Sequence, residues 1–301
     1  MITLSAANNE FLANLSNLNA RIVKDQQEVS SGLAVQNVSD DPGEVSAILQ
    51  LNARIANNNQ IGDNLGQVTT EVNAAEGALE DANNVMNTAK QLATEGSSTL
   101  TGGPTDQQLA LQVKDAITEM LGLTQTQAQG RYVFSGDSDQ TPPYASLNLA
   151  AANGVGVYQG SADTRTVQHP NGSTFTVSQT AAQIFDSGGP STSVLQSLTG
   201  LYNALTSGSA TAITAANNNI TTASAYLNTA LAQYGDYQNE VTNATSYQSQ
   251  LNIQLQAQLS VLQDADLPTA ITDMQENTTA QTAALESHSA LPNKSLFDYI
   301  G

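Results

Sequence analysis

Residues 65–93 read LGQVTTEVNAAEGALEDANNVMNTAKQLA. Apolar side chains recur in alternating steps of three and four residues, without a break from Leu65 to Ala93. This heptad pattern is typical of a helix that packs lengthwise on a partner helix. Proline, which interrupts helices, is absent from this stretch and its surroundings, so we predict one helix over about residues 43–97, roughly 80 Å long at 1.5 Å per residue.

Similar seams recur toward both ends of the chain. The first forty residues carry Phe11, Leu15, Leu18, Ile22 and Val29 at heptad spacing, with Asp25 in the skipped place. After a third helix over about residues 105–129, a long seam returns between Leu227 and Leu262. The last helix follows Asp264–Pro268 and has these residues at heptad places: Leu267, Ile271, Met274, Thr278, Gln281, Leu285 and His288.

The middle of the chain, residues 136–190, has a different character. It holds four of the eight prolines and several glycines, and short alternating runs such as Val155 to Val157 replace the heptads. Asn171-Gly172 lies between two β-rich runs, which is a strong hairpin signal. We predict a small β insertion here. Because Gly and Pro bound it, we expect that it can be removed without unfolding the helices.

Together these segments predict a mainly α protein: an elongated antiparallel helical bundle or coiled-coil rod with a small β insertion domain. In this arrangement residues 1–40 would lie beside residues 267–301 at one pole, residues 41–135 and 191–266 would form the long helices, and residues 136–190 would form the β insertion. Polar or small residues fall at or near seam positions: Asn58, Gly62, Gln248 and Thr278. The terminal helices look too weak to be stable alone, so we expect them to order only on assembly.

The composition excludes several classes of protein. The chain carries 27 acidic against 8 basic residues, a net charge of −19. Binding of nucleic acid or of an anionic membrane surface needs clustered Lys and Arg, so neither is predicted. The absence of cysteine excludes disulfides and thiolate catalysis. The longest apolar run, Leu149–Ala152, is too short to insert into a membrane, and the N-terminus has no features of a cleaved signal peptide.

No motif for catalysis, a metal or a cofactor stands out. The two histidines, His169 and His288, have no partner at zinc-helix spacing. Asp137–Gln140 lacks the later ligands of a calcium loop, and the glycines of Gly154–Gly160 depart from the dinucleotide-binding spacing. Structural roles explain these residues better, so no enzyme, metal or cofactor is predicted. The heptads by themselves fit an intramolecular bundle as well as an assembly seam.

Several stretches, taken in order, resemble the bacterial flagellin family. Near the N-terminus they are Leu15–Leu18, Glu28–Leu33 and Asn37–Pro42; in the middle they are Gly130–Gly136, Thr141–Tyr144, Val157–Gly160 and Thr164–Val167; near the C-terminus they are Asp264–Asp266 and Ser295–Ile300. The Ser39-Asp40-Asp41-Pro42 turn and the C-terminal ending are more similar to subunits of the hook–filament junction than to filament subunits.

This resemblance implies a structural protein of the flagellum: a junction subunit that adapts the hook to the filament and supports flagellin polymerisation. The alternative is flagellin, the filament subunit itself. The implied partners are further copies in a ring, the hook-side junction protein, flagellin and an export chaperone. The implied domains are a terminal coiled-coil assembly domain (residues 1–40 and 267–301), a helical rod domain (residues 41–135 and 191–266) and a small β outer domain (residues 136–190). The implied location is extracellular, after export through the flagellar type III apparatus. We expect the assembly interface to include Phe11, Leu15, Leu18, Ile22, Val29, Leu267, Ile271, Met274, Leu285, Leu296, Phe297, Tyr299 and Ile300.

Overall fold

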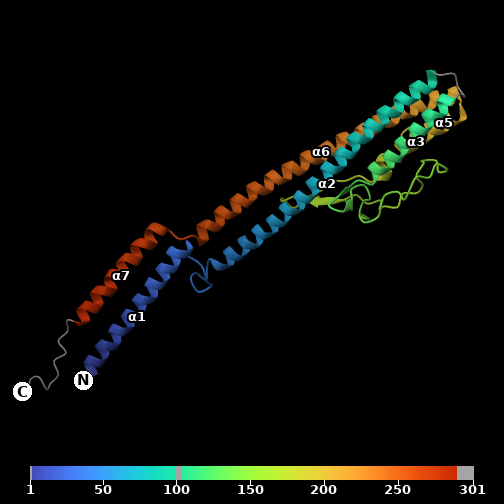
Figure 1. Ribbon diagram of the computed structural model, residues 1–301. Helices are drawn as coiled ribbons and strands as arrows, with labels where there is room; N and C mark the ends of the chain where they lie inside the picture. Colours follow the sequence, from blue (N-terminus) through green and yellow to red (C-terminus); the bar gives the residue numbers. More distant parts are fainter. Residues whose placement is uncertain (1, 99–103, 290–301) are drawn as a thin grey trace, which may run out of the picture. The chain divides into compact units, whose positions relative to one another are not determined.

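The computed structural model describes residues 2–98 and 104–289 of the chain (Figure 1). Its helices are α1 (Ile2–Ser31), α2 (Val45–Ser98), α3 (Pro104–Thr124), α4 (Ala181–Phe185), α5 (Val194–Ser207), α6 (Ala210–Gln263) and α7 (Leu267–Ser289). The chain divides into two compact units. We call Met1–Asn57 with Asn252–Gly301 the terminal unit, and Asn58–Leu251 the central unit. These units differ from the three segments expected from the sequence, and that three-part division stays a prediction.

Within the central unit, α2 and α6 run antiparallel (Figure 1). The heptad prediction is confirmed here, because seam residues of α2 such as Leu65, Leu79 and Met86 are fully buried. Helices α3 and α5 pack on each other and add Val113, Ile117, Leu198 and Leu201 to the same core. The mainly α fold class is therefore confirmed.

A polar crossing links α2 and α6 inside this pair. The side-chain amide of Asn58 donates to the carbonyl oxygen of Gln248 at 3.0 Å, and the amide of Gln248 donates to the carbonyl oxygen of Asn58 at 3.1 Å. Gln248 fits there because Gly62 has no side chain: a Cβ at position 62 would lie 2.9 Å from the amide nitrogen of Gln248. These two hydrogen bonds fix the register of α2 against α6, which is the role expected of polar residues at seam positions.

The predicted hairpin is present. Strand β3 (Thr166–Gln168) pairs antiparallel with β4 (Thr174–Thr176), and Gly172 turns between them at a φ of 95°. A second short pair, β1 (Gln127–Ala128) with β2 (Arg131–Tyr132), was not expected. It explains why the third helix ends at Thr124 and not near 129: a tight turn at Gln129 and Gly130, both with positive φ, takes over.

The predicted strand at Val155 to Val157 is wrong. These residues form a loop around Asn153, whose side-chain oxygen accepts a hydrogen bond from the Gly156 backbone N–H at 2.8 Å. Val155 is buried, whereas Val157 is 85% exposed. The alternation of Val and Gly in this stretch therefore does not mark a strand, because on this irregular loop Val155 points into the core and Val157 points to solvent.

The insertion shares the hydrophobic core of the helices. Tyr144, Ile184 and Phe185 are fully buried, and the Phe185 ring meets the Phe134 ring edge to face at 5.5 Å. Burial raises the pKa of the Tyr144 phenol far above its usual value, so this side chain stays neutral. The insertion is consequently part of what holds the central unit together.

Candidate assembly interface

In the terminal unit, α1 packs against α7. At one end of the pair the Phe11 ring stacks on the His288 ring, with centroids 4.0 Å apart and planes 10° apart. Among the described residues of these two helices, only Ile22 and Ala270 are buried apolar side chains. By the standard of a protein core, this contact therefore buries little apolar surface.

Polar side chains occupy the middle of the α1–α7 contact. The Asn277 amide donates to the Asp25 carboxylate at 2.7 Å, and the Gln281 amide donates to the side-chain oxygen of Asn19. The prediction that Asp25 and Gln281 lie in the seam is confirmed. Such pairs fix register between helices but add little stability.

The seam of α7 differs from the predicted one. Its α1-facing side is made of Ala270, Met274, Asn277, Gln281, Ala284 and His288, all at heptad spacing. Leu267, Ile271 and Leu285 are exposed, so placing them in the seam was wrong. Thr278 is also exposed and donates to the Met274 carbonyl oxygen. These outward residues leave an apolar row for other contacts, and their place in an assembly interface stays a prediction.

The predicted interface residues of α1 lie on its α7-facing side. Phe11, Leu15, Leu18 and Val29 are half-buried, and the first three line a groove of about 350 Å³ together with Ala280 and Ala284 of α7. Leu296, Phe297, Tyr299 and Ile300 lie outside the described residues.

Two short links connect α1 to α2 and α6 to α7 within the terminal unit. They bond to each other: the Ala34 N–H donates to the Gln263 carbonyl oxygen, and the Ala265 N–H donates to the Gly32 carbonyl oxygen, both at 2.8 Å. The Asp40 carboxylate accepts from the backbone N–H groups of Asn37 and Gln36, at 2.7 and 3.0 Å, which lowers the pKa of its carboxyl group. The predicted turn before α2 is thus confirmed.

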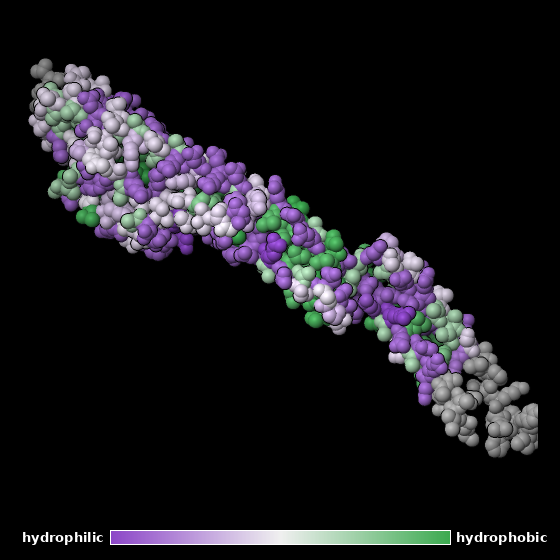
Figure 2. All heavy atoms as spheres, turned by 180° about the vertical axis from the view of Figure 1, so that it is seen from behind, coloured by the Kyte–Doolittle hydropathy of each residue, from purple (hydrophilic) through white to green (hydrophobic). Residues whose placement is uncertain are grey.

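An exposed apolar patch on the terminal unit was missed by sequence reasoning. Ile253 and Val261, 69% and 83% exposed, lie on one side of α6, and Leu49 of α2 is 62% exposed. Val261 also lines a groove of about 510 Å³, together with Leu51, Gln254, Ala257, Gln258 and Leu262. Hydrophobic side chains gather on this part of the surface in Figure 2. We call Ile253, Ala257, Val261 and Leu262 of α6 the apolar patch.

The sequence does contain a signal for the apolar patch. Residues 252–263 and 45–53 include no charged side chain, although the chain as a whole carries 27 acidic residues. Large exposed apolar areas usually mark interaction surfaces. Because the apolar patch is neutral, it can face an identical acidic chain without local repulsion.

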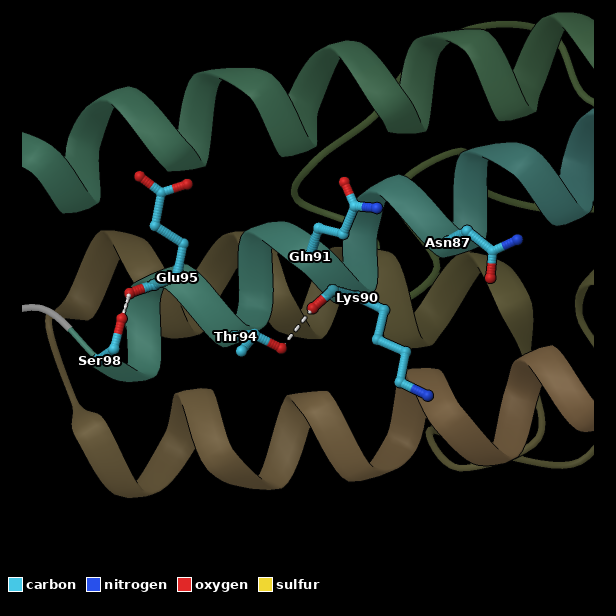
Figure 3. Close-up of a pocket in the computed structure, with 6 residues that line it drawn as sticks. All are labelled: Asn87, Lys90, Gln91, Thr94, Glu95 and Ser98. Carbon is cyan, nitrogen blue, oxygen red and sulfur yellow. Dashed lines mark hydrogen bonds between the residues drawn. The ribbon is translucent and has the colours of Figure 1, made fainter.

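A hollow in the central unit is lined by charged side chains, among them Glu71, Arg131 and Arg165. Another hollow, shown in Figure 3, is lined by side chains from the last turns of α2, and several of them bond to their own helix: Thr94 donates to the Lys90 carbonyl oxygen and Ser98 to that of Glu95, both at 2.8 Å. Residues 2–98 and 104–289 contain no cluster of His, Asp and Glu that could hold a metal ion. No helix within those ranges combines the length and apolarity needed to cross a bilayer.

The thin α1–α7 contact leads to a prediction about the isolated chain. Because few apolar side chains are buried there, α1 and α7 should open far more easily than α3 and α5. Hydrogen exchange followed by mass spectrometry should show protection factors at least about a hundredfold lower in α1 and α7. Strong protection around Leu15, Leu18 and Ile271 would contradict this expectation.

Residues 2–139 match the family described as the bacterial flagellin N-terminal helical region. Two relatives named flagellar hook-associated protein 3 are similar to this chain. The one from Salmonella typhimurium is 26% identical over 178 residues, which are 58% of this chain and 54% of the relative. The one from Escherichia coli is 25% identical over 174 residues, 58% of this chain and 53% of the relative. The match thus spans about half the length of these curated relatives.

Solved structures share the fold. A putative flagellar hook-associated protein from Vibrio parahaemolyticus superposes with a TM-score of 0.63 at 22% identity, over 74% of this chain and 99% of the other. Flagellar hook-associated protein 3 from Legionella pneumophila gives a TM-score of 0.62 at 15% identity, over 71% and 98%.

Proposed function

We propose that this chain, which resembles flagellar hook-associated protein 3, is a structural subunit of the bacterial flagellum at the junction between hook and filament. The observation that carries the proposal is the match to proteins of that name from two bacteria. The fold supports the proposal, because the flagellar hook-associated proteins from Vibrio parahaemolyticus and Legionella pneumophila superpose over 74% and 71% of this chain. A structural role, rather than catalysis, follows from the same similarity.

Self-association is the proposed activity, and two surfaces of the terminal unit would serve it. The first is the α1–α7 pair, whose own contact buries little and whose Leu267, Ile271 and Leu285 face outward. The second is the apolar patch. Covering apolar surface at about 25 cal/mol per Å² would supply the stability that the terminal unit lacks alone. Polar pairs such as Asn277 with Asp25 would keep the helices in register while neighbours add.

The proposed partners extend beyond identical copies. A junction subunit in a ring must contact the hook-side junction protein on one side and flagellin on the other. Delivery would use an export chaperone and the flagellar type III apparatus, which places the protein outside the cell without a cleaved signal peptide. These partners rest on the resemblance to the flagellin family, and the three-part division into terminal, rod and outer domains belongs to the same proposal.

Flagellin itself is the second candidate. One observation favours it: residues 2–139 match a family described as the N-terminal helical region of bacterial flagellin. The two candidates differ in what a cell without the chain would make. A missing junction subunit leaves filament protein without a base to grow on, whereas missing flagellin leaves no filament protein at all.

Deletion of the gene tests the proposal. We expect intact basal bodies and hooks by electron microscopy, flagellin as monomer in the medium, and non-motile cells. Complementation with the intact gene should restore filaments and serves as the control. Full-length filaments on the deletion strain would refute the junction role, and hooks without any secreted filament protein would identify the chain as flagellin.

A further inference from the structure

The β3–β4 hairpin needs support from its surroundings. Each strand has three residues, and no further strand from residues 2–98 or 104–289 joins the pair. An isolated two-stranded hairpin is at best marginally stable in water. Val167 is its one buried side chain within the strands, and Phe175 is half-buried. Contacts with the helices must therefore hold this hairpin in place.

On the α2 side, the hairpin is held by a carboxylate. The Glu71 side chain is 9% exposed, and its Oε2 lies 2.9 Å from Nη1 of Arg165, the residue directly before β3. Arg165 is fixed further, because its backbone N–H donates to the Ser178 hydroxyl at 2.8 Å and Nη2 donates to the Val133 carbonyl oxygen at 3.4 Å. A buried carboxylate is tolerated only when paired, so this ion pair ties the base of the hairpin to α2.

A second arginine converges on the same carboxylate. Nη1 of Arg131, in β2, lies 3.8 Å from Oε1 of Glu71, and its Nε lies 3.2 Å from the Asp139 carboxylate. Two of the eight basic residues in this acidic chain thus meet at one glutamate. Both arginines are thus held by carboxylates, Arg165 by Glu71, and Arg131 by Glu71 and Asp139.

On the α6 side, the hairpin makes contact at its base and at its tip. The Gln179 backbone N–H, just past β4, donates to the Tyr234 hydroxyl at 3.1 Å, and the Gln179 amide donates to the Gln233 side-chain oxygen at 2.6 Å. At the tip, the His169 ring lies 5.2 Å from the Tyr247 ring. The hairpin therefore touches both long helices of the central unit.

We propose that the β3–β4 hairpin packs across α2 and α6, and that Glu71 is the positioning residue that holds it there through Arg165. We call the Glu71–Arg165 ion pair the latch. When the latch is broken, the hairpin detaches and moves while the helices beneath it stay folded. This inference concerns the isolated chain and does not depend on the proposed function.

Glu71→Gln tests the latch with little change in side-chain volume. The amides of His169 and Val177, which donate to the Ser173 and Arg165 carbonyl oxygens, should exchange about tenfold faster or more in the full-length variant. Amides in α3 and α5 should keep their exchange rates. The matched control is Glu80→Gln, an exposed glutamate on the same helix, which should leave all these rates unchanged.

A distance measurement reports motion directly. The chain has no cysteine, so cysteines introduced at the exposed Thr174 and Asp81 are the only sites for spin labels. The distance distribution between the labels should be narrow in the parent chain and in Glu80→Gln, and broad in Glu71→Gln. An unchanged narrow distribution in Glu71→Gln would overturn the proposal.

Arg165→Met addresses the same latch from the hairpin side. If Glu71 acts through Arg165, Glu71→Gln and Arg165→Met should each accelerate exchange, and the double variant should be no faster than the faster single one. Additive effects of the two changes would refute the pairing. Loss of helix content by circular dichroism in both single variants would also refute the proposal, because the latch would then hold the helices and not the hairpin.

Discussion

Aspartate at both Ile253 and Val261 is expected to abolish self-association of this chain and leave its fold intact. Both side chains are largely exposed, so the change removes no internal contact. In an assembly that covers the apolar patch, two carboxylates would be desolvated against a neutral surface, and association should weaken at least about a hundredfold. The measurements are sedimentation of the purified chain and motility of a deletion strain that carries the variant gene.

Val157→Asp is the matched control for this experiment. Val157 is as exposed as Val261, but it lies on a loop of the insertion in the central unit. The same charge at that position should leave assembly and motility unchanged. If the Ile253→Asp/Val261→Asp variant assembles as well as the parent chain, the apolar patch is not an assembly surface.

Removal of residues 140–188, with a short Gly-Ser join, is expected to unfold the central unit. Sequence reasoning led to the opposite expectation, because Gly and Pro bound the insertion. The structure argues against it, since Tyr144, Ile184 and Phe185 are fully buried in the core that the helices share. Their loss would exceed the usual stability margin of a domain, about 5–15 kcal/mol, once the cavity left behind is included. Circular dichroism during heating should show no cooperative transition.

A point substitution measures the same effect without shortening the chain. Phe185→Ala should lower the free energy of unfolding by about 3–5 kcal/mol, because a fully buried ring is lost from contact with Phe134. Phe175→Ala, at a half-buried ring of the hairpin, is the matched comparison and should have a clearly smaller effect. Equal and small losses at both positions would mean that the insertion is separable after all.

The long helices could be predicted because their apolar seams repeat over many turns, with only a few interruptions such as Asn58 and Gln248. Between Leu65 and Ala93 every heptad place is apolar, and the structure buries almost all of them. The hairpin at Asn171-Gly172 was also accessible, since its turn chemistry is local. The β1–β2 pair escaped prediction because two-residue strands carry no periodicity.

The interface was harder to predict for a physical reason. Sequence reasoning assumes that the largest apolar residues face the helix's own partner, and in α7 that places Leu267, Ile271 and Leu285 in the seam. The structure instead turns Ala270 and Asn277 inward. In the proposed assembly, neighbours would cover the outward apolar residues, so these residues need not face the helix's own partner. Likewise, no pattern around Glu71 predicts its partner Arg165, which comes from a distant segment.

The crossing of Gln248 over Gly62 has a consequence for how such sequences can change over time. A side chain at position 62 would displace the amide group of Gln248. Replacement of Gln248 by a small residue would leave the Asn58 carbonyl oxygen without the hydrogen bond that this amide donates. A change at either position alone therefore costs the hydrogen bond that the Gln248 amide donates to the Asn58 carbonyl oxygen, and a matching change at the other position limits this cost. Among sequences that keep this helix pair, positions 62 and 248 should therefore covary in size, a small residue at one accompanying a long amide at the other.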